Sequence, residues 1–502
     1  MRGAPRIMLL GLALAFVACG PSARNAADDD DDDNSTCQPG STSDCYDGAD
    51  GTEGVGPCHA GTRVCGDDSH WGSCSNEVVP VAENCTDGVD NNCNGQVDED
   101  VDEDGDGFTS CGGGDCCDST AVCSNPTLVN PGAFDAPGNG VDDDCDGIVD
   151  NTTPVCDTGL ASNSSDAMDY AKAIDLCQTA TMADKKWGVI SATFTKADGT
   201  GTPASKAHSI RPHFGSGVTP KVGSSLMEIS TGAAAAEGDT NPAYEDLEDG
   251  DGAGGSSDWP SDFISANGGM LPNAPGCPAA ESQDCDACDP VMLTLTIRVP
   301  TNASSFSINS NFFSSEFPEY VCSPFNDFFV MLLDSTWSGT PANPSDKNLA
   351  FYQPMNSADK YPVGVNLAYG NTGLFTQCES GQTGCDSILY GGHEGTITCT
   401  GTDELAGTGL DTAGFDECNQ SDEGGGTGWL STTGNVVGGE IIKLRIALWN
   451  TSDHALQSLA VIDGFQWSVE ASDPGTVIGR TEPTLANGKL TVPLHRNASY
   501  LQ

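Results

Sequence analysis

Positive charge is scarce in this chain of 502 residues. The sequence contains 19 Lys and Arg against 73 Asp and Glu, which gives a formal net charge of −54. Proteins that bind nucleic acid or anionic lipid directly need clustered cations to contact the phosphates. The composition therefore argues against nucleic acid as a partner and favours divalent cations, which neutralise carboxylates.

An apolar run long enough to span a bilayer is missing as well. The N-terminal run, residues 7–17, is shorter than the roughly 20 residues that a spanning helix needs. It follows two arginines and ends at Ala18, as a secretory signal does. The segment resembles a bacterial lipoprotein signal, in which the cysteine after the cut is acylated. We therefore expect residues 1–18 to be removed and Cys19 to anchor the protein at the outer membrane or cell surface of a Gram-negative-type bacterium.

The known active-site patterns are absent too. The seven histidines are scattered without the spacing of a zinc site, and there is no Gly-x-Ser-x-Gly elbow and no phosphate-binding loop. We therefore predict a protein that is not an enzyme. A secreted hydrolase that uses carboxylates stays open as the alternative.

Cysteine, in contrast, is abundant. Without Cys19 the chain has 22 cysteines, an even number that suits complete pairing in an oxidising compartment. They fall into groups within residues 37–145, 156–177 and 277–418, which predicts pairing inside each group. Cys285 and Cys288 have the spacing of a redox or zinc pair, but such a compartment favours a structural disulfide with Cys277 or another neighbour.

The acidic residues are concentrated near the N-terminus. Residues 28–150 hold 31 carboxylates and one basic residue, Arg63. Six consecutive aspartates repel one another, so residues 19–36 are predicted to form an extended tether. Residues 37–84 combine five cysteines with many glycines, and Cys85 follows directly, which predicts a loop-rich module held by disulfides.

An internal repeat occupies residues 85–155. Residues 90–98 and 142–150 both have oxygen-bearing side chains at positions 1, 3, 5 and 9 and Gly at position 6, as EF-hand calcium loops do. The Glu at position 12 and the flanking helices of an EF-hand are missing. A further ladder of alternating carboxylates lies between the two segments. The candidate metal ligands are Asp90, Asn92, Asn94, Asp98, Asp102, Asp104, Asp106, Asp142, Asp144, Asp146 and Asp150.

This repeat resembles the metal-binding motif repeats of bacterial surface proteins, in the order Cys-x-Asp-Gly-x-Asp-Asn-x-Cys, Asp-Gly-Asp-Gly-Phe, Gly-Asp-Cys and Asp-Asp-Asp-Cys-Asp-Gly. The family has been linked to copper. Copper favours imidazole, thiolate and thioether ligands, whereas carboxylates and carbonyls suit calcium. We therefore expect calcium, with copper, another divalent ion or a metal-free acidic spacer as alternatives. The family's usual Asp-Cys-Asp-Asp is Asp115-Cys-Cys-Asp118 here, and Cys117 is expected to pair with a neighbouring cysteine.

The C-terminal region, residues 156–475, has the pattern of a mainly β domain. One short helix is predicted at 166–177. The predicted strands are 187–194, 291–299, 328–333, 440–449 and 459–462, several of them with alternating apolar residues. Many strands with little helix predict an antiparallel β-sandwich or jelly roll. For the tail, residues 476–502, the sequence predicts no function.

Residues 165–475 also resemble the choice-of-anchor L domain, most specifically at Ser315-Glu-Phe-Pro-Glu-Tyr320 and Phe325-Asn-Asp327. The resemblance implies display at the cell surface. Glu316, Glu319 and Asp327 are possible binding residues. A catalytic carboxylate pair, a bound cation and turn chemistry around a proline are the three interpretations of these residues.

Together these patterns predict a non-enzymatic cell-surface lipoprotein. A calcium-binding stalk would display a β-sandwich for adhesion to a glycan, a matrix or a protein on another cell. A protein that sequesters metal at the surface is a further alternative.

Overall fold

The computed structural model describes residues 36–479, apart from 152–153, 249, 251, 281–283, 412–417 and 419–423, and also the backbone of 484–486 and 489–491. The chain divides into two compact units. The first contains residues 1–80 and 93–95, and the second contains 81–92 and 96–502. The predicted signal peptide, Cys19 and the tether up to residue 35 lie outside the described residues.

The first unit is a small loop-rich body. Its two strands, β1 (Thr42–Cys45) and β2 (Gly61–Val64), pair antiparallel. Three disulfides hold it, and they join Cys37 to Cys65, Cys45 to Cys74 and Cys58 to Cys93. So small a unit buries little apolar surface, and disulfides supply the stability that its core cannot.

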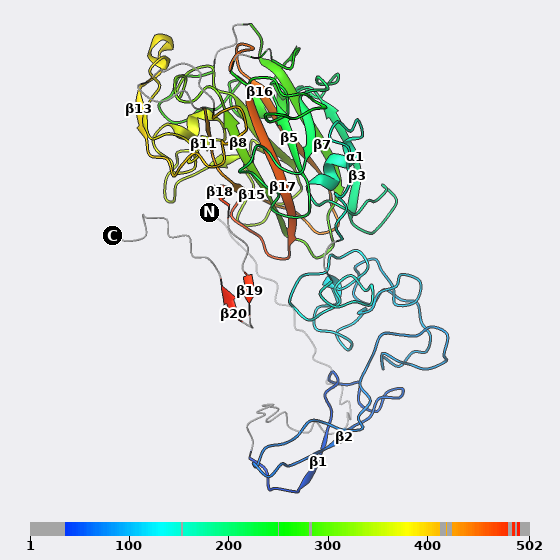
Figure 1. The fold of residues 1–502 in the computed structure, drawn as a ribbon. Helices are drawn as coiled ribbons and strands as arrows, with labels where there is room; N and C mark the ends of the chain where they lie inside the picture. The colour runs from blue at the N-terminus through cyan, green and yellow to red at the C-terminus, as the bar shows by residue number, and fades with distance from the viewer. Residues whose placement is uncertain are drawn as a thin grey trace, which may run out of the picture. The chain divides into compact units, whose positions relative to one another are not determined.

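The second unit contains two antiparallel sheets (Figure 1). The larger sheet has the order β18-β15-β8-β17-β5-β4, with β14 also paired to β8. Its strands are β4 (His208–Arg211), β5 (Leu226–Ser230), β8 (Ser305–Ser314), β14 (Gly425–Gly426), β15 (Leu430–Asn435), β17 (Ser458–Ser468) and β18 (Gly475–Ile478). The smaller sheet has the order β3-β7-β16-β9, with β6 also paired to β7. Its strands are β3 (Gly188–Thr195), β6 (Ser256–Ser257), β7 (Ala287–Arg298), β9 (Phe328–Asp334) and β16 (Ile441–Asn450).

The remaining elements are short. Three strand pairs stand apart from the two sheets: β10 (Phe351–Tyr352) with β11 (Tyr361–Pro362), β12 (Gly381–Thr383) with β13 (Gly395–Ile397), and β19 (Thr484–Ala486) with β20 (Lys489–Thr491). The helices are α1 (Ala167–Ala173) and α2 (Ser261–Ala266), with single 3-10 turns at Pro126–Leu128, Val365–Ala368 and Ser387–Tyr390.

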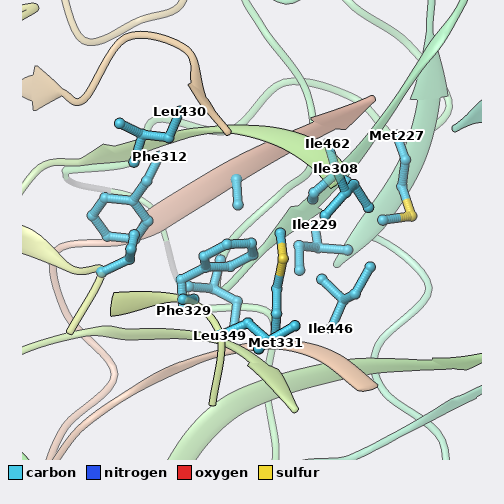
Figure 2. Packing of buried hydrophobic residues seen from close by; sticks show 14 of the residues in the cluster. Met227, Ile229, Ile308, Phe312, Phe329, Met331, Leu349, Leu430, Ile446 and Ile462 are labelled. Atoms are coloured by element: carbon cyan, nitrogen blue, oxygen red, sulfur yellow. The ribbon is translucent and has the colours of Figure 1, made fainter. Parts of the chain in front are cut away.

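The two sheets pack face to face, so the predicted β-sandwich is confirmed. One core cluster combines side chains of both sheets, and Figure 2 shows Phe312, Ile308 and Ile462 on one side of it opposite Met331 and Ile446 on the other. The five predicted strands are all present. Alternation along β16 produces this arrangement, because every second side chain of a strand points to the same face.

The predicted helix is present as α1 but ends earlier than expected. Asp166 caps its N-terminus by accepting a hydrogen bond from the Met168 N–H at 3.0 Å. Ile174 caps its C-terminus, and Asp175 follows with a positive φ of 72°. A residue in this left-handed conformation cannot continue a right-handed helix, which is why the chain turns away before residue 177.

All 22 cysteines from Cys37 to Cys418 are paired, and the predicted pairing inside each group is confirmed. Cys117 bonds to Cys123, as expected of a thiol that pairs with a neighbour. Cys285 and Cys288 bond to each other, whereas Cys277, the partner named from the sequence, bonds to Cys322. The other bonds join Cys85 to Cys111, Cys116 to Cys145, Cys156 to Cys177, Cys378 to Cys399 and Cys385 to Cys418.

Among the described residues, no helix has the length and apolar character needed to cross a membrane.

Candidate metal centre

Three loops of the acidic segment share one backbone conformation. They are residues 90–96, 102–108 and 142–148, each with oxygen-bearing side chains at positions 1, 3 and 5. The glycine at position 6 has a φ of 95°, 96° and 91° in the three loops. The residue at position 4 also has a positive φ, which is 58° at Cys93, 82° at Gly105 and 57° at Cys145. Glycine tolerates this left-handed conformation, and each of the two cysteines is held by a disulfide.

Hydrogen bonds of the same pattern hold the second and third loops. In the second loop, Asp102 Oδ2 accepts from the Gly107 N–H at 2.9 Å and Asp106 Oδ1 accepts from the Phe108 N–H at 2.8 Å. In the third loop, Asp142 and Asp146 accept from the corresponding N–H groups at 2.9 and 2.8 Å. The second oxygens of Asp102, Asp142 and Asp146 accept further hydrogen bonds, from the Gly105 N–H at 2.6 Å, the Asp146 N–H at 3.1 Å and the Asn151 side chain at 2.6 Å. The second oxygen of Asp106 has no partner among the described residues.

The second loop lies beside two further carboxylates, those of Asp115 and Asp118. Ligand atoms of Asp102, Asp104 and Asp106 lie within 4.8 Å of one another, and so do those of Asp104, Asp115 and Asp118. We call these five residues the central cluster. Asp142, Asp144 and Asp146 form a second group of the same kind in the third loop.

Asp115 is the most buried member of the central cluster, at 2% exposure. Its Oδ1 accepts from the Cys117 N–H at 2.8 Å, but its buried Oδ2 has no hydrogen-bond partner among the described residues. The buried Oδ2 atoms of Asp104 and Asp106 are in the same state. Burying a carboxylate oxygen without a hydrogen-bond donor costs free energy. A cation bound between these three oxygens would compensate that cost.

Burial dominates the electrostatics of both groups. It raises the pKa of Asp115 to about 7, and the carboxylates of Asp106, Asp118 and Asp104 raise it further. Burial and the neighbouring carboxylates also raise the pKa of Asp106 to about 6, and that of Asp104 in the same direction. In the third loop the pKa of Asp144 is raised to about 6 for the same reasons. Without a cation, both groups therefore hold their negative charge at a cost.

The two position-9 residues, predicted to be ligands, contact a preceding turn. Asp98 Oδ1 accepts from the Gly88 N–H at 3.0 Å. Asp150 Oδ1 accepts from the Gly138 and Asn139 N–H groups at 2.7 and 3.0 Å. Both aspartates have a positive φ, 53° and 52°. At position 9, where an EF-hand has a metal ligand, these carboxylates instead bind the backbone of the turn that precedes each loop.

In the first loop, Asp90 and Asn92 are buried at 5% and 4% exposure, and Asn94 is exposed. Glu83, which the sequence did not single out, accepts from the Asn91 and Asn92 N–H groups at 3.0 and 3.1 Å. Asp135 stands at the equivalent place before the third loop and accepts from the Asp143 N–H at 3.2 Å. One acidic side chain thus holds the start of each repeat.

The donors of the central cluster fit a hard cation. They are all carboxylates, and residues 85–150 contain neither His nor Met. The cysteines beside the cluster are oxidised, Cys116 with Cys145 and Cys117 with Cys123, so they cannot act as thiolates. Oxygen donors without imidazole or thiolate suit calcium, magnesium or manganese better than copper.

A family described as "Putative metal-binding motif", whose name refers to copper, matches residues 76–99 and 124–151. The two matched segments contain the first and third loops. The central cluster lies between them. Comparison with curated proteins and with solved structures gave no significant match. The chain therefore carries a recognised metal-binding motif in a disulfide-rich setting, and the identity of the metal rests on the ligands.

Two other groups singled out in the sequence lie in the β domain. Cys285, Cys288 and His454 lie close together, but the disulfide between the cysteines removes them as thiolate ligands. Glu316 and Asp327 are buried side by side, and the Asp327 N–H donates to Glu316 Oε2 at 3.4 Å. Glu319 is only half-buried.

Asp115 and Asp118 were not among the predicted ligands, although both stand in the Asp-Cys-Cys-Asp segment. The signal that could have found them is Cys116, the first of the two cysteines between them, because its bond to Cys145 in the third loop holds this segment within the repeats.

Proposed function

We propose that residues 81–151 bind divalent cations, calcium before others, and that the protein is a non-enzymatic surface protein that displays its β-sandwich on this acidic segment. The observation that carries the proposal is the buried Oδ2 of Asp115, which has no hydrogen-bond donor among the described residues and lies in a cluster with four further aspartates.

Calcium is favoured by the number and irregular arrangement of the oxygens. It accepts six to eight oxygen ligands in flexible geometry, whereas magnesium demands a near-ideal octahedron and keeps several waters. Asp102, Asp104, Asp106, Asp115 and Asp118 would hold the ion in the central cluster, and Asp142, Asp144 and Asp146 would hold one in the third loop. Affinities of about 10⁻⁴–10⁻³ M, typical of extracellular calcium modules, are expected.

The role of the cation would be mechanical. The acidic segment cannot neutralise itself, because residues 28–150 contain a single basic residue. Bound calcium would cancel the repulsion and stiffen the segment. Acylation at Cys19 would supply the membrane attachment, and the resemblance of residues 165–475 to the choice-of-anchor L domain favours display toward a glycan, a matrix or another cell.

Calorimetric titration of the oxidised full chain with calcium, magnesium and copper tests the proposal. Saturable calcium binding is expected, weakened at least about tenfold at the central cluster by Asp115→Asn, since ligand charge sets affinity. Asp67→Asn is the matched control, because Asp67 is an exposed aspartate outside the repeats. Binding of copper without calcium would refute the choice of metal, and no binding at all would leave the segment as an acidic spacer.

A further inference from the structure

A disulfide, a histidine and a buried aspartate lie next to one another at the start of β7. Cys288 is the second residue of this strand, and it bonds to Cys285 just before the strand. Cys285 Sγ lies 3.5 Å from His454 Nε2, and His454 Nδ1 lies 2.7 Å from Asp289 Oδ2. His454 comes from the loop between β16 and β17, 169 positions away from Cys285. The fold therefore places an imidazole beside a disulfide and a carboxylate behind the imidazole.

Asp289 fixes the orientation of the imidazole. It is 1% exposed, and its other carboxylate oxygen accepts a hydrogen bond from the Gly254 N–H. Because the carboxylate faces Nδ1, the network assigns the ring hydrogen to Nδ1, and Nε2 presents its lone pair to Cys285. The Gln457 Nε2 also donates to the His454 carbonyl at 2.7 Å, which holds the loop. A sulfur, a base and an orienting carboxylate in this order form the general arrangement that activates a thiol.

The two sulfurs differ in their access to solvent. Cys288 is fully buried at 0% exposure, whereas Cys285 is half-buried and the His454 side chain is exposed. A thiolate that arrives from solution is therefore directed to Cys285, where it meets the imidazole, and Cys288 is the sulfur that leaves.

This disulfide contributes less to folding than the others. It spans 3 positions of the sequence, whereas the other ten span 6 to 45. The restriction that a disulfide imposes on the unfolded chain grows with the length of the loop that it closes. Of the eleven bonds, the one between Cys285 and Cys288 therefore does the least to hold distant parts of the chain together.

We infer that Cys285 and Cys288 form a thiol–disulfide exchange site, at which the β domain captures a partner that carries a neutral or positively charged thiol. The capture is stoichiometric and involves no turnover, so it is compatible with a non-enzymatic surface protein. It uses none of the carboxylates of the acidic repeats, and it does not depend on their binding a metal.

The exchange has two steps. His454 Nε2 takes the proton of the incoming thiol, and the thiolate attacks Cys285 Sγ. A new S–S bond then joins the partner to Cys285, while the bond to Cys288 breaks and its electron pair leaves on Cys288 Sγ. The imidazolium stabilises the departing thiolate, because the His454 nitrogen lies within 4.8 Å of both protein sulfurs. A second thiol that attacks the partner's sulfur releases Cys285, and the protein has then gained two electrons and two protons from the two thiols.

The charge around the disulfide selects the partner. Asp284 and Asp286 flank Cys285, and Asp453 precedes His454. These carboxylates repel an anionic thiol and attract a cationic one.

The rate at which each disulfide opens tests the inference. The oxidised full chain is treated with limiting dithiothreitol under native conditions, new thiols are alkylated at intervals, and peptide mapping follows each bond. The bond between Cys285 and Cys288 should open at least about tenfold faster than that between Cys378 and Cys399. The latter pair is the matched control, because it also joins a buried to a half-buried cysteine of the β domain. Equal rates would overturn the inference.

Replacing the histidine separates an activated disulfide from one that is merely accessible. His454→Gln should slow the opening of the bond between Cys285 and Cys288 at least about tenfold, without a change in Tm. His393→Gln is the matched control, because His393 is another exposed histidine of the β domain, and it should leave the rate unchanged. An unchanged rate in His454→Gln would show a purely structural disulfide.

A second readout uses Cys285 as a free thiol in the Cys288→Ala variant. At pH 6, iodoacetamide should alkylate this thiol at least about tenfold faster than in the Cys288→Ala, His454→Gln double variant, because the imidazolium stabilises the thiolate. The two rates should converge at pH 10, where both thiols are ionised. Equal rates at pH 6 would contradict the role of His454.

Small thiols of different charge test the choice of partner. Each rate is divided by the rate of the same thiol with a small neutral disulfide, which removes differences in intrinsic reactivity. On this scale, cationic cysteamine should open the bond at least about tenfold faster than anionic glutathione at low salt, and the difference should shrink in high salt. A preference for glutathione would overturn the choice. All these rates should be the same in calcium and in chelator, so the outcome is independent of the titration of the acidic repeats.

Discussion

Replacing Asp115 by Asn should have opposite consequences for folding and for metal binding. The substitution keeps the shape of the side chain and removes its charge. In the metal-free protein the pKa of Asp115 is raised from 3.8 to about 7 by burial and by neighbouring carboxylates. Above pH 7 the ionised Asp115 therefore destabilises the folded state. Removing its charge reduces the repulsion among the carboxylates of the central cluster.

The structure sets the size of the effect. A shift of about three pK units, at about 1.4 kcal/mol per unit, gives an upper limit of about 4 kcal/mol. Water reaching the half-buried neighbours reduces the expected gain to roughly 2–4 kcal/mol. In calcium this advantage should shrink by about 1.4 kcal/mol for each tenfold loss of affinity, because binding stabilises the wild type more than the variant.

Native-state hydrogen exchange of residues 102–118 measures this local stability. The assay compares wild type and Asp115→Asn at pH 8 in chelator and in calcium, and again in chelator at pH 5. The group has a raised pKa in the folded state, so the wild type gains stability as the pH falls below 7, and most of the variant's advantage should disappear at pH 5. A variant that is less stable than wild type in chelator, or one that gains as much from calcium, would refute the reasoning.

Two further predictions follow from the same geometry. Calcium affinity should fall at least about tenfold between pH 8 and pH 5.5. The ion must displace protons from Asp115, whose pKa is about 7, and from Asp106 and Asp144, whose pKa values are about 6. Titration calorimetry at several pH values would show this fall, and an affinity that does not change with pH would contradict it. Replacing Cys116 and Cys145 by Ser opens a disulfide with a sequence separation of 29, which should cost the repeats about 3–4 kcal/mol of local stability and weaken calcium binding. Replacing Cys378 and Cys399, a pair in the β domain with a separation of 21, should leave calcium binding by the repeats unchanged, and equal effects of the two double variants would argue against a specific role for the first.

The sequence alone predicted the features that depend on local interactions. The second and third acidic loops are visible in it because several of their hydrogen bonds join residues two to five positions apart, as between Asp102 and Gly107. The strands are visible because alternation places every second side chain in the core. The even number of cysteines likewise indicated complete pairing, since pairing depends on the compartment as much as on the fold.

Tertiary structure alone decided which distant groups meet. Asp115 and Asp118 join the second loop because the chain folds back over them and Cys116 is bonded to Cys145. Glu316, Asp327 and Asn450 converge because β8, β9 and β16 end at the same place, although up to 134 positions separate them. Burial also separated Glu316 from Glu319, which the sequence treated alike. Such contacts depend on how whole strands pack, and a pattern read along a few residues carries no information about which strand ends become neighbours.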